Sequence, residues 1–244
     1  MIAHDQPTCF NGAVLAAVSS KSDGTMLDRA IGVHNGSIVS NRTLFCQKLK
    51  VDYGDIVFQR IIYADNQSYK DMAEVDDRST TKNLSEVAAD ALYTTALGVG
   101  LFLPVGDCVA TVLYDPKRKA LALAHLGRHS SYSKLARGVT EQFISQGSEP
   151  KDIVVWMSPH AKKDSYKLSW FDKADDPDWQ GFYEVKPDGT YLDLAGFNGG
   201  LLKGAGVLPS NIHVSSVDTM QDSNYFSHAG GDTTGRIGVI AMMK

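Results

Sequence analysis

Residues 106–127 read GDCVATVLYDPKRKALALAHLG, and this stretch decides the fold of the chain. Two apolar runs, at 109–114 and 120–124, stand on either side of the charged turn Asp115-Pro116-Lys117-Arg118-Lys119. Apolar runs around a short turn are typical of two paired antiparallel strands. The stretch therefore predicts a β-hairpin, with Cys108 before its first strand and His125 near the end of its second.

The register of this hairpin decides whether the thiol and the imidazole meet. A turn centred after Lys117 places Ala110 opposite His125 and Cys108 opposite Gly127. Cys108 and His125 are then diagonal neighbours on one face, about 7–8 Å apart, whereas a shift of one residue turns His125 to the other face. Such a pair can act as nucleophile and base, but both residue types are also common in cores. The pattern leaves both interpretations open.

The composition is typical of one soluble globular domain. A chain of 244 residues with 43% hydrophobic and 21% charged residues is ordinary for such a protein, and we expect a single domain over residues 1–244. The net charge of −4, without a basic stripe, argues against nucleic acid or membrane as a partner. Three scattered cysteines without a CxxC spacing, no signal-peptide pattern and no apolar run of about 18 residues predict a cytoplasmic protein. For its assembly, a monomer or a homodimer is expected.

The pattern along the chain predicts a mixed α/β fold (α+β, a mixed sheet with flanking helices), because strands and helices alternate without a strict βαβ repeat. Besides the hairpin, strands are expected at 12–20, 56–63, 98–105, 153–157, 211–214 and 236–243, with 153–157 as a central strand. Helices are expected at 40–49, capped by Ser40 or Asn41, at 130–146, and at 192–205 with Asp193 near its cap. Residues 22–36 and 71–84 are expected to be loops, and 85–93 fits either a helix or a strand.

Several short motifs resemble, in the same order, those of one known family. The matching segments are Val39-Ser40-Asn41-Arg42, Ala89-Asp90-Ala91-Leu92-Tyr93-Thr94, Gly106-Asp107-Cys108, Leu113-Tyr114-Asp115-Pro116, His125-Leu126-Gly127, Ser158-Pro159, Ser165-Tyr166, Tyr191-Leu192-Asp193-Leu194 with Asn198, Phe226-Ser227 and Thr234-Gly235-Arg236. Spread over nearly the whole chain, they resemble the laccase-domain family, also called multicopper polyphenol oxidoreductases, YfiH-like proteins or peptidoglycan editing factors.

The resemblance implies a YfiH-like fold, similar to that of the cytotoxic necrotizing factor deamidases. It also implies a single zinc ion held by two His and one Cys, of which Cys108 and His125 carry over. Thiolate and imidazole are normal zinc ligands, and a three-ligand site leaves one position for water or substrate. The implied activities are phosphorolysis of adenosine or inosine, adenosine deamination through a metal-activated water, and editing of peptidoglycan precursors. Copper is not expected, since polyphenol oxidation needs more metal ligands than these motifs supply.

Two features of the chain depart from the family pattern. The remaining His ligand of the family belongs to the segment that here reads Gln59-Arg60-Ile61-Ile62-Tyr63, where Ile62 or Tyr63 occupies the ligand position. Candidates for a substitute ligand are His34, His129 and His228. The family's arginines after the HLG-like and FS-like segments are also replaced. The polar residues expected to contact the substrate are Asn41, Arg42, Arg128, His129 and Arg236. Asp107 is expected to be structural, as a cap or as a partner of Arg128.

Three functions therefore follow as hypotheses. The first is a zinc-dependent enzyme, a transferase or hydrolase, that acts on purine nucleosides at Cys108 and His125. The second is a metal-free cysteine hydrolase or deamidase, in which Cys108 attacks and His125 is the base. The third is a binding protein whose ancestral site has lost its activity.

Overall fold

The computed structural model describes residues 1–28, 35–62, 70–75 and 86–244. Ten of the described strands form one mixed sheet in the order β1-β13-β5-β2-β4-β7-β6-β8-β12, with β3 paired to β4 beside this path. Their bounds are β1 Val14–Val18, β2 Ile56–Arg60, β3 Lys70–Glu74, β4 Glu86–Thr94, β5 Gly100–Val105, β6 Val109–Asp115, β7 Ala120–Leu126, β8 Val154–Met157, β12 Ile212–Val214 and β13 Ile237–Met243. The predicted mixed α/β fold is confirmed.

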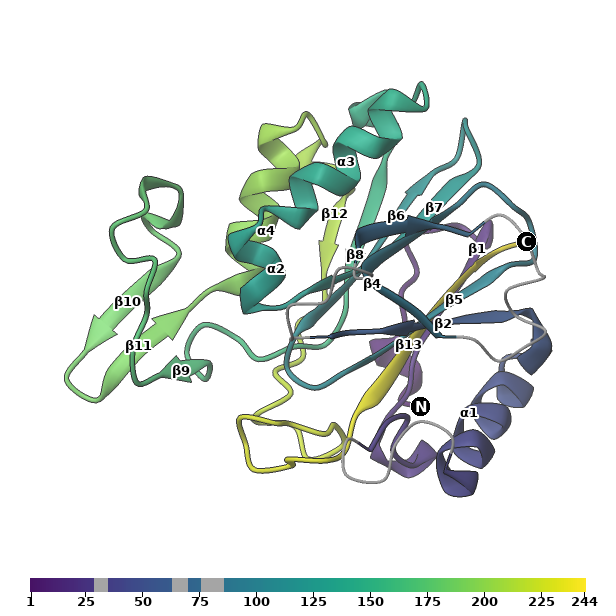
Figure 1. The fold of residues 1–244 in the computed structure, drawn as a ribbon, viewed down its shortest axis with the longest axis horizontal. Coiled ribbons are helices and arrows are strands. Elements are labelled where there is room, and N and C mark those ends of the chain that lie inside the picture. The colour runs from purple at the N-terminus through teal and green to yellow at the C-terminus, as the bar shows by residue number, and fades with distance from the viewer. Residues whose placement is uncertain (29–34, 63–69, 76–85) are drawn as a thin grey trace.

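Four described α-helices lie against this sheet: α1 Gly36–Lys48, α2 Arg128–Tyr132, α3 Leu135–Ser145 and α4 Leu194–Gly204. Figure 1 shows α3 and α4 together on one side of the sheet and α1 far from them, at the other end of the molecule. Short 3-10 helices occupy Ala3–Asp5, Lys21–Asp23, Tyr53–Asp55, Pro150–Asp152, Pro177–Trp179 and Pro209–Asn211. Within the described residues, no helix combines the length and apolar character that crossing a bilayer requires.

The hairpin of β6 and β7 forms with the predicted register. Ala110 pairs with His125 and Val109 with Leu126, so Cys108 and Gly127 follow at the open end. The carboxylate of Asp115 accepts hydrogen bonds from the backbone N–H groups of Lys117 and Arg118. This local capping stabilises the turn and with it the register.

The sheet is strongly curled, and its inner face forms a core of its own. β5 and β13 contact β7 across this face, although β2 and β4 separate them from it in the sheet. β5, β6, β7 and β13 are buried along their whole length, because the sheet covers itself on the inner side while helices cover much of the outer side. Burial on both faces explains why these strands read as continuous apolar runs.

Several expected elements differ in the structure. α1 begins at Gly36 with Asn35 as its cap, not Ser40 or Asn41, because the Asn35 side chain accepts the N–H of Ser37. Part of the expected loop at 71–84 is strand β3, which pairs with β4; residues 76–84 lie outside the described part. The stretch at 85–93 is strand β4 from Glu86.

Two further expectations need correction. The single helix expected at 130–146 is two helices, α2 and α3, because Lys134 between them takes a left-handed backbone conformation with φ of 59°. The strand expected to be central, β8, lies next to last in the sheet, between β6 and the short edge strand β12. The helix at 192–205 is confirmed as α4, and the Asp193 side chain caps it by accepting the N–H of Gly196 at 2.7 Å.

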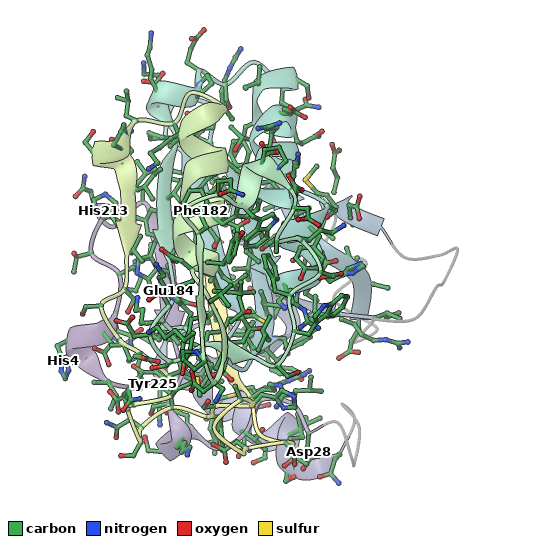
Figure 2. The ribbon with its side chains drawn as sticks, turned by 90° about the vertical axis from the view of Figure 1, so that its left-hand side faces the viewer. His4, Asp28, Phe182, Glu184, His213 and Tyr225 are labelled. Carbon is green, nitrogen blue, oxygen red and sulfur yellow. The ribbon has the colours of Figure 1, made fainter. Side chains whose placement is uncertain are left out.

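A second, small sheet projects from the body as an arm, on the left in Figure 1. Its strands are β9 Lys167–Leu168, β10 Tyr183–Lys186 and β11 Gly189–Leu192, in the order β10-β11-β9. Figure 2 views the molecule from this side, with Phe182 and Glu184 of the arm labelled. Phe182 packs against Phe197 of α4, with their ring centroids 5.7 Å apart. This contact joins the base of the arm to the helical layer.

His160, in the loop after β8, gives the stability of the fold a dependence on pH. The side chain is 1% exposed, its Nδ1 donates to the carbonyl oxygen of Ser158 at 2.6 Å, and Nζ of Lys162 lies 3.2 Å from its Nε2. Burial, and after it the charge of Lys162, lowers the pKa of His160 to about 4 from its ordinary value of 6.5.

The depressed pKa sets the direction of the effect. Between pH 6.5 and about 4 the unfolded chain binds a proton that the folded chain excludes, so the free energy of unfolding falls as the pH drops through this window. Near pH 5 the loss amounts to about 2 kcal/mol. We expect His160→Gln to reduce the difference in stability between pH 7.5 and pH 5 by that amount, as measured by urea unfolding. An equal pH dependence in both proteins would contradict this assignment.

Candidate active site

A cavity of about 1000 Å³ opens at the end of the hairpin where Cys108 and His125 lie. Its walls come from the end of β2, the start of β4, the turn between β5 and β6, the start of α2 and the segment around β9. Asp28, another lining residue, is labelled at the lower end of the molecule in Figure 2. The cavity is large enough for a drug-sized or nucleoside-sized molecule.

Cys108 and His125 face each other across Gly127. A Cβ atom at Gly127 would lie 3.0 Å from Sγ of Cys108 and 3.0 Å from Nε2 of His125. The sulfur and the nitrogen therefore flank the same small space, which exists because residue 127 has no side chain. Cys108 is half-buried, His125 is buried, and both line the cavity. The structure thus brings together the pair that the hairpin register predicts.

Asp90 of β4 orients the imidazole. Its Oδ1 lies 2.8 Å from Nδ1 of His125, and both side chains are buried. A carboxylate can only accept, so Nδ1 carries a proton and donates to Asp90, and in the neutral imidazole Nε2 is the acceptor. The arrangement is therefore Asp90–His125–Cys108. Asp90 was not among the expected site residues, although it lies in the matched segment 89–94.

The turn that carries Cys108 is fixed by Asp107. This residue has a positive φ of 70°, which is uncommon outside glycine. Its carboxylate accepts the Thr219 hydroxyl and the Ala229 N–H, each at 2.7 Å. Of the two structural roles expected for Asp107, a cap or a partner of Arg128, these contacts correspond to the first, because the carboxylate binds a backbone N–H and a hydroxyl of neighbouring loops.

The residues expected to contact substrate fall into two groups. Arg128 and His129, at the start of α2, and Arg236 line the cavity together with Cys108 and His125. Arg236 lies against Gly106, where a Cβ would be 3.1 Å from its Cδ, and its Nη1 donates to the carbonyl oxygen of Gly235 at 2.6 Å. Three cationic or titratable side chains thus reach the cavity from two separate parts of the chain.

Asn41 and Arg42 are placed behind the cavity wall instead. The Asn41 amide donates to the carbonyl oxygen of Thr25, and the Arg42 Nε donates to that of Met26. Nη1 of Arg42 lies 3.7 Å from a carboxylate oxygen of Glu86, which itself lines the cavity. Neither Asn41 nor Arg42 is among the residues that line it.

Gln59, at the end of β2, lines the cavity with a side chain that is almost fully buried. Its Nε2 donates to the carbonyl oxygen of Ala89 at 3.0 Å, which sets the orientation of the amide. Its Oε1 is buried and accepts no hydrogen bond from the described residues. A buried acceptor without a donor is costly to the fold, and because this atom is closed off from the cavity surface, it offers no contact to a bound molecule.

The described residues do not complete a zinc site. Two residues were expected at the position of the family's second His. Ile62 is not among the residues that line the cavity, although its neighbour Ile61 is, and Tyr63 lies outside the described residues. Of the substitute ligands, His129 and His228 line the cavity, and His34 also lies outside the described part. No group of three metal-ligating side chains occurs among residues 1–28, 35–62, 70–75 and 86–244. Because zinc sites use three or four protein ligands, these residues alone do not fit a resident zinc ion.

The comparison with known sequences decides the family. The family described as "Multi-copper polyphenol oxidoreductase laccase" matches residues 18–244. The chain belongs to this laccase-domain family. It is 26% identical to the purine nucleoside phosphorylase YlmD of Bacillus subtilis over 241 residues, which cover 89% of this chain and 84% of that protein. It is 25% identical to the adenosine deaminase RL5 of an unknown prokaryotic organism over 188 residues, 72% of this chain and 69% of that protein.

Two more relatives complete the comparison of the laccase-domain chain. A purine nucleoside phosphorylase of Deinococcus radiodurans is 29% identical over 153 residues, which cover 61% of this chain but only 58% of that protein. The crystal structure of the hypothetical protein YfiH from Bacillus licheniformis superposes with a TM-score of 0.79 at 27% identity, covering 95% of this chain and 93% of that one. The expected YfiH-like fold is confirmed.

Proposed function

We propose that this laccase-domain protein acts on purine nucleosides in the cavity, with Cys108 and His125 as the reacting side chains. The observation that carries the proposal is the opposition of the thiol and the Asp90-oriented imidazole at the wall of a nucleoside-sized cavity. Relatives that match most of the chain are named purine nucleoside phosphorylase and adenosine deaminase, which supports this substrate class.

The protein's own residues can move one proton in a defined direction. With Nδ1 of His125 donating to Asp90, Nε2 of the neutral imidazole can take a proton from the thiol of Cys108, from a bound water or from phosphate. The resulting imidazolium is stabilised by the Asp90 carboxylate. In deamination, the deprotonated water adds to the carbon that bears the amine, the carbon–nitrogen bond breaks, and Nε2–H protonates the leaving amine. In phosphorolysis, phosphate bonds to C1′ as the glycosidic bond breaks, and Nε2–H protonates the leaving base. Arg128, His129 and Arg236 supply positive charge or hydrogen-bond donors for an anionic co-substrate such as phosphate.

A zinc ion could take part only if a ligand besides Cys108 and His125 completed its site. Cys108 and His125 would be two of its ligands, and the metal would supply an activated water. Since the described residues supply no third ligand, the proton transfer described above does not involve a metal.

The experiment that tests the proposal measures turnover together with metal content. Protein purified without an affinity tag is incubated with adenosine or inosine, with and without phosphate, before and after treatment with a chelator. We expect phosphate-dependent release of the base, or conversion of adenosine to inosine. No turnover of either nucleoside by the untreated protein would contradict the proposal. Loss of turnover on chelation, restored by zinc, would support a metal-dependent route.

A second candidate is a metal-free cysteine hydrolase or deamidase, and the contact between Asp90 and His125 favours it. The Cys108 thiolate would add to an amide carbonyl carbon, and the amine would leave with the proton from Nε2 of His125. Water would then hydrolyse the thioester and regenerate the thiol. Activity that survives chelation and is lost on alkylation of Cys108 would support this candidate. The similarity of the fold to the necrotizing factor deamidases stays a prediction.

A further inference from the structure

Trp170 is the most exposed of the large hydrophobic side chains of the described residues, and it lines the cavity. Its exposed fraction is 72%, compared with 4% for Trp156 and 1% for Trp179, the other two tryptophans of the chain. Exposing an indole of this size to water is unfavourable. An exposed Trp at a cavity wall is therefore a candidate contact for a ligand.

The neighbours of Trp170 hold its backbone in place. Phe171 is buried, with its ring centroid 5.2 Å from that of Trp179 and 5.3 Å from that of Tyr183. On its other side, Asp172 accepts the hydroxyl of Tyr132 at 2.7 Å. Trp170 is thus presented by an anchored segment while its own ring stays exposed.

The chemistry of this part of the wall favours a flat, aromatic ligand. Tyr132, Tyr166 and Leu168 line the cavity together with Trp170. The Tyr132 ring is already held edge-on by Trp179, with the centroids 5.7 Å apart. Trp170 is the aromatic ring of this group with the most surface left to cover. Indole offers a large π face, which binds a nucleobase by stacking irrespective of the base.

We propose that Trp170 stacks on the purine base and so sets the preference of the site for nucleosides over sugars without a base. This inference rests on the proposed function and names the residue that recognises the base. Trp170 acts on binding and takes no part in proton transfer. Its removal should therefore weaken the binding of adenosine and inosine about 10–100-fold and raise KM with little change in kcat.

The test uses the full chain and three ligands: adenosine, inosine and ribose. Because Trp156 and Trp179 are buried, quenching of the exposed Trp170 should report binding by fluorescence. Calorimetry gives Kd for the variants. We expect Trp170→Leu to bind adenosine and inosine about 10–100-fold more weakly, with no change in Kd for ribose. Trp170→Phe should keep most of the nucleoside affinity, because the ring can still stack. The matched control is Val185→Ala, since Val185 is 70% exposed on the same arm but does not line the cavity.

The outcomes separate this inference from the proposed function. Turnover of nucleosides by the unchanged protein together with unaltered KM and Kd in Trp170→Leu overturns the role of Trp170 alone. Equal weakening of ribose and adenosine also overturns it, because the effect is then not directed at the base. Absence of nucleoside binding and turnover in the unchanged protein overturns the proposed function, and this inference with it.

Discussion

Replacing Cys108 by serine is expected to lower nucleoside turnover by about 10³-fold or more without unfolding the protein. Serine keeps the size of the side chain but provides neither a thiolate at neutral pH nor a good metal ligand. The cysteine-hydrolase route uses this sulfur as its nucleophile, and the nucleoside route uses it as a reacting thiol or, with zinc, as a ligand beside Nε2 of His125. The measurement is kcat/KM for adenosine and inosine, with thermal unfolding as the check on the fold.

The matched control is Cys9→Ser, because Cys9 lies away from this cavity. Burial raises the pKa of the thiols of Cys9 and Cys46 to about 11, so both are poor nucleophiles at neutral pH. Alkylation by iodoacetamide near pH 7.5 should therefore concentrate on Cys108, and a bound nucleoside should slow it. If Cys108→Ser turned over nucleosides within about threefold of the unchanged protein, the proposed role of Cys108 as a reacting side chain would be contradicted.

Replacing Asp90 by asparagine is expected to lower turnover by about 10²–10⁴-fold, as loss of the orienting carboxylate does in related arrangements. Asparagine can donate from its amide to Nδ1 of His125, which would move the imidazole proton to Nε2. The group facing Cys108 would then be a donor and could no longer accept a proton. Asp90 is a positioning residue, so the readout includes the tautomer of His125, observed by nitrogen NMR, as well as the rate.

Asp115→Asn is the matched control for removing a buried carboxylate. Asp115 lies in the same sheet, is fully buried, and caps the turn of the hairpin away from the cavity. This variant should lose stability but keep its activity per folded molecule. If Asp90→Asn behaved in the same way, with the tautomer of His125 unchanged, the orienting role of Asp90 would be refuted.

Local sequence patterns predicted those parts that depend on local physics. The hairpin register followed from two apolar runs and a turn whose Asp115 caps its own backbone. α4 followed from Asp193 as its cap. Local patterns did not predict the left-handed backbone at Lys134, which splits the helix expected at 130–146. They also did not predict β3, a polar strand that is stabilised by pairing with β4 and not by its own sequence.

For the candidate site too, local sequence predicts one part and the tertiary structure decides the rest. The sequence by itself determined the pairing of Cys108 with His125, because both lie in one hairpin whose side chains alternate with a period of two. Only the tertiary structure decided that Asp90 holds the imidazole, that Arg128 and Arg236 reach the same cavity, and that Trp170 is left exposed at its wall. These residues lie on separate elements, and their distances depend on how the sheet curls and how the arm packs. No spacing along the chain encodes that curvature.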